Sequence, residues 1–179
     1  SHCGQLRLPL DFLVQRFSPV RLLFCLPLLV ACAAAPNTAE TQAPVDGRGL
    51  VGANLDGAQQ DLDREFAQGK WVTLVFWQDW CTSCLAEAPH VQVDSRVYRS
   101  RVSFYGVVSG ADLTEHDMGL RTKIRELGLT YPQIRDRNGA WSERFHVSST
   151  PTILVFSPDG NLRYRGNHLP EDWLGLMTE

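Results

Sequence analysis

Apolar stretches of strand type alternate with stretches of helical periodicity from Gly49 to the end of the chain. The run 71–77 is almost continuously β-branched and aromatic, which is typical of a central strand buried on both faces. Apolar residues recur at helical spacing over 82–97, where Pro89 predicts a kink, and again between Thr114 and Gly128. Further strands are predicted at 103–108, 152–156 and 161–165. The order β-α-β-α-β-β predicts an α/β fold in which helices flank a central mixed β-sheet.

Shorter sequence motifs predict two turns and one further short helix. An Asn138-Gly139 turn precedes a short helix that ends near Phe145. The turn 157–160, Ser-Pro-Asp-Gly, lies between two strand-like runs and predicts a closing hairpin.

The first third of the chain has a different character. An uncharged apolar run over 22–35 follows Arg7, Arg16 and Arg21 and is too short to span a bilayer, which takes about 20 residues. This order is typical of a secretory signal, and Pro27 argues against a buried core helix. Its end, Leu-Val-Ala-Cys at 29–32, resembles the lipobox of bacterial lipoproteins, which implies a lipid on Cys32. The alternative is ordinary signal cleavage near residues 33–35.

These observations divide the chain into a lipoprotein-type signal peptide (1–31), a flexible linker (32–48) and one domain (49–179). Removing the signal takes away three arginines and one aspartate, which changes the net charge from -3 to about -5. An acidic domain offers no field that attracts phosphates, so we expect no nucleic-acid partner. Three cysteines then remain, and if Cys32 holds lipid, Cys81 and Cys84 form a pair.

The pair lies where the predicted central strand gives way to a helix. Free N–H groups and the helix dipole stabilise a thiolate at such a position. A spacing of two residues lets Cys84 close on Cys81, so the pair can exchange disulfides through a mixed disulfide on Cys81 that Cys84 resolves. A structural disulfide would close too short a loop to stabilise much. A zinc site would need two more ligands, and the histidines, which we expect at the surface, show no paired spacing: His90, His116, His146 and His168.

A set of motifs runs through the whole domain: Phe-Trp at 76–77, Trp-Cys-Thr-Ser-Cys at 80–84, Glu87, Pro89 and Ser-Thr-Pro-Thr at 149–152. With these motifs, residues 49–179 resemble a thioredoxin-fold domain, a redoxin (AhpC/TSA-like) domain of the exported TlpA/ResA group of thiol-disulfide oxidoreductases. Residues 110–136 resemble the insertion that distinguishes this group from plain thioredoxin.

The resemblance implies roles for individual residues. Cys81 matches the exposed nucleophile, Cys84 the buried resolving cysteine, and Pro151 a cis-proline that faces the disulfide and exposes the backbone of Thr150 to substrate. Glu87 matches an acidic residue near the pair that influences its protonation. Trp80 is expected to contact substrate. Thioredoxin has a buried aspartate where this chain has Val75, which leaves Glu87 as the candidate proton acceptor.

We therefore predict a thiol-disulfide oxidoreductase that uses no cofactor or metal, is exported to the periplasmic or cell-envelope side, and is anchored to a membrane through lipid on Cys32. The resemblance implies reduction of protein disulfides, with apocytochrome c or another envelope protein as substrate and a membrane reductase as electron donor.

Two alternatives remain open. One is a thiol peroxidase of the peroxiredoxin type, although residues 72–80 lack the proline of the peroxidatic motif. The other is a copper-binding chaperone that uses Cys81, Cys84 and a histidine, because soft thiolates suit Cu(I).

Overall fold

The structure is a computed structural model that describes residues 45–110 and 114–178, with only the backbone at 114–116. Its core is a five-stranded mixed sheet in the order β5-β4-β3-β6-β7. Strand β3 lies in the middle, parallel to β4 and antiparallel to β6. The bounds are β3 Trp71–Phe76, β4 Val102–Ser109, β5 Gln133–Asp136, β6 Thr152–Phe156 and β7 Leu162–Gly166. The predicted mixed sheet of a thioredoxin-like fold is confirmed.

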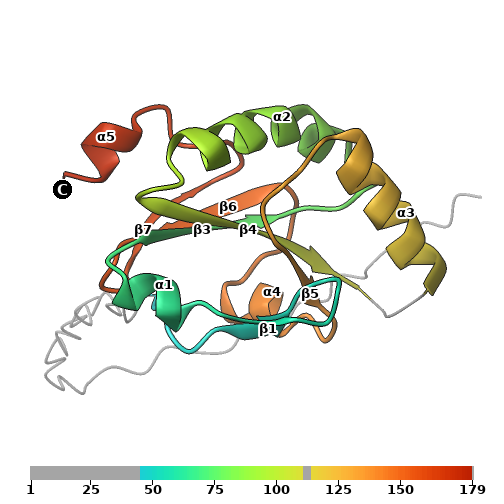
Figure 1. Cartoon of the computed structure of the whole chain (residues 1–179), viewed down its shortest axis with the longest axis horizontal. Coiled ribbons are helices and arrows are strands. Elements are labelled where there is room, and N and C mark those ends of the chain that lie inside the picture. The colour runs from blue at the N-terminus through green and yellow to red at the C-terminus, as the bar shows by residue number, and fades with distance from the viewer. Residues whose placement is uncertain (1–44, 111–113, 179) are drawn as a thin grey trace, which may run out of the picture. The chain divides into compact units, whose positions relative to one another are not determined.

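Helices cover both faces of this sheet (Figure 1). Helices α2 (Thr82–Val97) and α3 (Thr114–Glu126) lie on one face, and α1 (Asp63–Ala67) and α4 (Ala140–Arg144) lie on the other. Side chains alternate along β3, so Val75 packs into the α2 core and Leu74 into the opposite core. Burial on both faces explains why the 71–77 run is apolar throughout.

Three predicted boundaries agree closely with the structure. Helix α2 has the predicted bounds, and Pro89 lies inside it. The second predicted helix becomes α3, and Gly128 follows it with φ 62°. The predicted closing hairpin is the β6–β7 pair.

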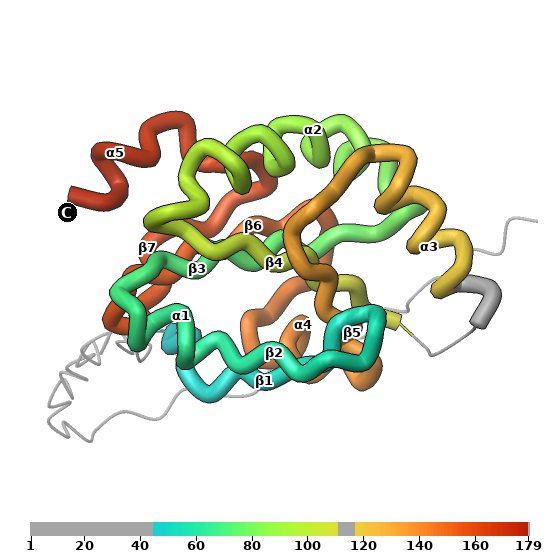
Figure 2. The backbone as a smooth tube through the Cα atoms, viewed as in Figure 1, coloured from blue at the N-terminus to red at the C-terminus, as the bar shows by residue number. Residues whose placement is uncertain are grey.

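The pattern did not predict the hairpin of β1 (Val51–Ala53) and β2 (Gln59–Asp61), helix α1 or helix α5 (Trp173–Leu176). Figure 2 shows the hairpin running beside β5, where Asn54 forms a bridge with Ile134. These elements have three to five residues, so they are too short to show a hydrophobic period.

The first described residues belong to the body of the domain. Gly47 N donates to Gly160 O at 2.8 Å, and Leu162 N donates to Val45 O at 3.0 Å. Residues 45–47, which lie within the predicted linker, thus bind the β6–β7 hairpin. The predicted signal peptide and Cys32 lie outside the described residues. Within the described part of the chain, no helix combines the length and apolar character that a bilayer crossing requires.

Candidate active site

The register of the central sheet brings two sequence motifs together. Phe76 at the end of β3 pairs with Thr152 at the start of β6. Cys81 follows β3, and Pro151 directly precedes β6, so the loop before β6 lies against the start of α2. As a result Cys81 Sγ lies 3.4 Å from the carbonyl oxygen of Thr150, although 69 residues separate them in the chain.

Cys81 and Cys84 form a disulfide whose Cα atoms are 5.2 Å apart. Cys81 is the N-cap of α2, and its Sγ accepts a hydrogen bond from Cys84 N at 3.2 Å. When the disulfide is open, this N–H group and the positive end of the helix dipole stabilise negative charge on Cys81 Sγ. The arrangement is the one that the strand-to-helix position of the motif predicts.

The expected contrast between an exposed Cys81 and a buried Cys84 is small in this disulfide form. Cys81 is 7 % exposed and Cys84 3 %. Both Thr150 O and Ser83 Oγ lie 3.4 Å from Cys81 Sγ and cover it.

The peptide bond between Thr150 and Pro151 is cis, as the resemblance implied. Thr152 Oγ1 donates to Ser149 O at 2.7 Å, and this hydrogen bond stabilises the loop. Pro151 also lines a small cavity beneath the disulfide together with Cys84. Thr150 and Pro151 thus meet both cysteines of the pair.

Glu87 is buried, and it lines a cavity near the disulfide. It is 8 % exposed, and it lines the same cavity as Cys84. Its Oε1 accepts a hydrogen bond from Leu169 N at 2.9 Å, and its Oε2 lies 3.0 Å from His168 Nδ1. Glu87 is therefore not a solvated helix charge, the alternative that the sequence left open.

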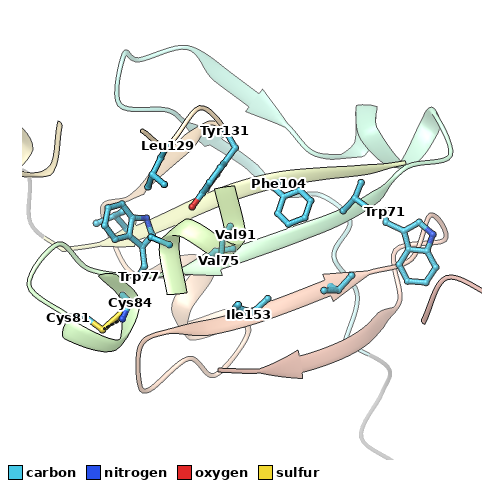
Figure 3. Close-up of a cluster of buried hydrophobic side chains, with 14 of the residues drawn as sticks. Trp71, Val75, Trp77, Cys81, Cys84, Val91, Phe104, Leu129, Tyr131 and Ile153 are labelled. Atoms are coloured by element: carbon cyan, nitrogen blue, oxygen red, sulfur yellow. Dashed lines mark hydrogen bonds between the residues drawn. A yellow bond between two sulfur atoms is a disulfide. The ribbon is translucent and has the colours of Figure 1, made fainter. Parts of the chain in front are cut away.

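The cavity measures about 10 Å³, close to the smallest that holds one water molecule. Val75 forms part of its wall at the position where thioredoxin has an aspartate. Tyr131 lies on the opposite side, and Figure 3 shows its hydroxyl pointing toward the Trp77 side of this cluster. Burial raises the pKa of Tyr131 well above its usual value, so this hydroxyl keeps its proton. Among the described residues that line the cavity, Glu87 is the one carboxylate.

The two tryptophans near the motif have different environments. Trp77 is buried, and its Nε1 donates to Gln133 Oε1 at 2.9 Å, so it is a core residue. Trp80 is 73 % exposed, next to Cys81. Trp80 and Thr150 line a surface pocket of about 260 Å³.

Sequence reasoning missed several residues around the site. Gln78 lines the Trp80 pocket, and its Nε2 donates to Ser109 O at 2.9 Å, whereas its buried Oε1 has no hydrogen-bond partner among the described residues. Three serines from different parts of the chain also line this pocket: Ser109 at the end of β4, Ser142 in α4 and Ser148 before β6. His168 is exposed, as predicted, but its contact with Glu87 was not foreseen. No local motif marks these side chains, because distant segments bring them to the site.

This chain is similar in sequence and structure to known proteins. The model of the AhpC/TSA family matches residues 35–165. The chain belongs to the AhpC/TSA family. Within it, similarity extends to "Soluble secreted antigen MPT53" of Mycobacterium tuberculosis, 28% identical over 118 residues, which covers 66% of this chain and 61% of that protein. "Thiol-disulfide oxidoreductase ResA" of Oceanobacillus iheyensis is 30% identical over 96 residues, covering 53% of this chain and 48% of ResA. The chain thus spans about half to three fifths of the length of these curated relatives.

Solved structures that are similar to this chain have the same fold. A secreted Mycobacterium tuberculosis disulfide oxidoreductase, described as homologous to E. coli DsbE, superimposes with a TM-score of 0.59 at 25% identity, over 72% of this chain and 94% of that one. StoA from Bacillus subtilis shares the fold at 20% identity, with a TM-score of 0.61 over 76% of this chain and all of StoA. The resemblance to ResA-type proteins is confirmed as distant homology.

Proposed function

We propose that this protein is a thiol-disulfide oxidoreductase that exchanges disulfides with cysteines of other proteins through Cys81 and Cys84. One observation supports this most directly: the pair lies at the N-terminus of α2 with Cys81 Sγ 3.4 Å from the Thr150 carbonyl of the cis Thr150–Pro151 loop. Relatives described as thiol-disulfide and disulfide oxidoreductases support the same activity.

The reaction begins with the reduced pair. Cys81 thiolate attacks one sulfur of a substrate disulfide, which forms a mixed disulfide and releases the other substrate sulfur as a thiolate that takes up a proton. Cys84 then loses its proton and attacks Cys81 Sγ. This step forms the Cys81–Cys84 disulfide seen here and releases the second substrate thiol. The substrate gains two electrons and two protons, and the protein pair loses them.

Glu87 is the acceptor of the Cys84 proton in this scheme. It lines the cavity that Cys84 lines, it is buried, and Val75 supplies no alternative group. A positioned carboxylate of this kind raises the rate of proton transfer to or from a reacting group.

The substrate binds across the Trp80 pocket. Trp80 supplies an exposed aromatic surface, and serine side chains of the same pocket supply polar groups. Together they suit an extended polar segment around a cysteine. Envelope proteins such as apocytochrome c fit this description.

The protein works on the exported side of a membrane as a reductant, with lipid on Cys32 as its anchor and a membrane reductase as electron donor. Export is supported by the relative described as a soluble secreted antigen. The reduction potential tests the direction: a value near about -270 mV, as in thioredoxin, supports a reductant, and a value near about -120 mV supports an oxidase.

Trapping in cells tests the activity itself. A Cys84→Ser variant of the full chain keeps the nucleophile but cannot resolve the mixed disulfide, so it is expected to accumulate disulfide-linked partners. The matched Cys81→Ser variant is expected to trap none. Equal recovery from both variants contradicts the proposal. Peroxide consumption by the reduced protein without any disulfide substrate supports the peroxidase instead, and tight Cu(I) binding without disulfide exchange supports the copper chaperone.

A further inference from the structure

Glu87 has a partner at the surface that the proposed exchange does not use. His168 lies in the segment between β7 and α5, 81 residues from Glu87 in the chain. Its Nδ1 is 3.0 Å from Glu87 Oε2, and its side chain is 69% exposed, whereas that of Glu87 is 10% exposed. The pair therefore joins a buried carboxylate to solvent through one imidazole ring.

The segment that presents His168 is held in place at several points. Leu169 N donates to Glu87 Oε1 at 2.9 Å, and Tyr164 Oη donates to His168 O at 2.8 Å. A Cβ at Gly166 would overlap the Tyr164 hydroxyl, so the absence of a side chain there lets the tyrosine reach its acceptor. Both hydrogen bonds hold the peptide group that joins His168 to Leu169, so the contact with Glu87 is part of a built arrangement.

Glu87 also separates two spaces. On the inner side it lines the 10 Å³ cavity with Cys84. On the outer side it lines a surface pocket of about 340 Å³ with His90, Asp94 and His168. A proton that leaves Cys84 for Glu87 must cross from the first space to the second before Glu87 can act again.

We propose that His168 is a positioning residue that passes this proton between Glu87 and solvent during release of substrate. The inference rests on the proposed function. Cys84 gives its proton to the Glu87 carboxylate, and the Cys84 thiolate attacks Cys81 Sγ, which breaks the mixed disulfide. The protonated Glu87 then passes its proton to His168 Nδ1, which is 3.0 Å away, and the imidazole gives a proton to water. Histidine suits this task because it gains and loses a proton between about pH 5 and 8.

Other charged groups face the pair from the elements around it. His90 and Asp94 of α2 line the outer pocket, and Asp94 Oδ2 accepts a hydrogen bond from Trp173 Nε1 at 2.7 Å. Burial, and then the charges of Glu87 and Glu171, raise the pKa of Tyr164, so this hydroxyl stays a donor to the segment. Tyr131 faces the inner cavity and keeps its proton. Of these groups, His168 is the one in hydrogen-bond contact with the Glu87 carboxylate.

Single-turnover kinetics of the full chain tests the proposal. The reduced protein is mixed with rising concentrations of glutathione disulfide, and tryptophan fluorescence follows oxidation. At low concentration the rate reports attack by Cys81, and at saturation it reports resolution by Cys84. A Cys84→Ser variant gives the first step alone.

In His168→Asn an amide replaces the imidazole beside Glu87, but it cannot carry a proton. We expect its saturated rate at pH 7 to fall about tenfold, less than the loss for a directly reacting group, and the pH profile of that rate to differ from the wild-type profile. The low-concentration rate stays unchanged. Free imidazole restores the saturated rate of His168→Ala, because the outer pocket admits it. His90→Asn, which changes an exposed histidine of the same pocket, behaves as wild type.

The possible outcomes test the role of His168 and the proposed function separately. A His168→Asn rate and pH profile equal to wild type overturn the role of His168, while a slowed Glu87→Gln then leaves the proposed function standing. A loss in His168→Ala that imidazole does not restore also overturns it, because a structural role would give that result. Failure of the wild type to form the Cys81–Cys84 disulfide from glutathione disulfide overturns the proposed function itself.

Discussion

Gly106→Ala is expected to destabilise the domain through the side chain of Gln133. Gly106 on β4 pairs with Gln133 on β5, and a Cβ at Gly106 would overlap the Gln133 amide. That amide is buried, with the residue 6% exposed, so moving it disturbs the packing around it. It accepts from Trp77 Nε1 at 2.9 Å and donates to Tyr131 O at 3.0 Å. Moving it breaks both hydrogen bonds.

The size of the effect follows from three contributions. Overpacking a filled interior costs about 1–3 kcal/mol. Leaving buried donors or acceptors unpaired costs about 1–3 kcal/mol for each group. The loss of backbone freedom in the unfolded chain returns about 0.4–1 kcal/mol. Because relaxation of the strands trades overpacking against lost hydrogen bonds, we expect a net loss of about 2–4 kcal/mol in the free energy of unfolding. That is a large part of the stability of an ordinary domain, about 5–15 kcal/mol.

The assay is guanidinium unfolding of the oxidised protein, followed by tryptophan fluorescence. Gly119→Ala is the matched control, because it makes the same chemical change inside α3, where the new Cβ meets Asp79 at an ordinary contact of 3.6 Å. Ala is favoured over Gly in a helix by about 1 kcal/mol, so this variant is expected to gain stability. The two substitutions should therefore have opposite signs.

A double-mutant cycle with Gln133→Ala isolates the mechanism. If the Gln133 amide causes the loss, the two substitutions together cost less than the sum of their separate effects by at least about 1 kcal/mol. Additive effects, or a Gly106→Ala variant as stable as wild type, would refute the reasoning.

Three further predictions concern other parts of the domain. Burial raises the pKa of Glu65, but hydrogen bonds from Ser103 and Lys70 and the charge of Lys70 outweigh it and hold the pKa below its usual value. The stability from Glu65 is thus present above the ordinary glutamate pKa of about 4.3 and lost as pH falls through the lowered folded-state pKa, so in acid titrations Glu65→Gln should show a weaker loss than wild type. Trp80→Ala should lower kcat/KM about tenfold for a protein disulfide such as insulin but much less for glutathione disulfide, with unfolding within about 0.5 kcal/mol of wild type; equal effects on both substrates would contradict a docking role. Asp136→Ala removes an acceptor for two backbone N–H groups at the start of α4, at 3.1 and 3.0 Å, and should cost about 2 kcal/mol, whereas Asp136→Asn should cost less.

Elements with a strong local pattern were predictable from the sequence. The bounds of α2 and β6 agree with prediction, and the central strand differs by one residue at its end. The fit is close because burial on two faces leaves a continuous apolar run, and a long helix repeats its apolar positions. Helix α5 lacks such a signal. It has four residues, and its Trp173 packs against the rings of Tyr98 and Phe104, which come from other parts of the chain.

The site also contains residues that the local sequence predicts and residues that it does not. Cys81 and Cys84 were identified because a local rule applies to them: two thiols one turn apart at a helix start. Glu87 was named through resemblance, and its burial could not be inferred, because the groups that bury and bind it, His168 and Leu169, come from a segment 81 and 82 residues away. A neighbour at that distance in the chain leaves no periodic trace near Glu87.

The sequence by itself thus determined the chemistry available: a strand, then a helix that begins with a reactive pair of thiols. Only the tertiary structure decided what surrounds that pair. Antiparallel pairing of β6 with β3 places the Thr150 carbonyl 3.4 Å from Cys81 Sγ, and the segment after β7 brings His168 to Glu87. The physical reason is that a thiol at a helix start depends on neighbours within one turn, whereas access, proton transfer and substrate contact depend on residues that meet only when the sheet assembles.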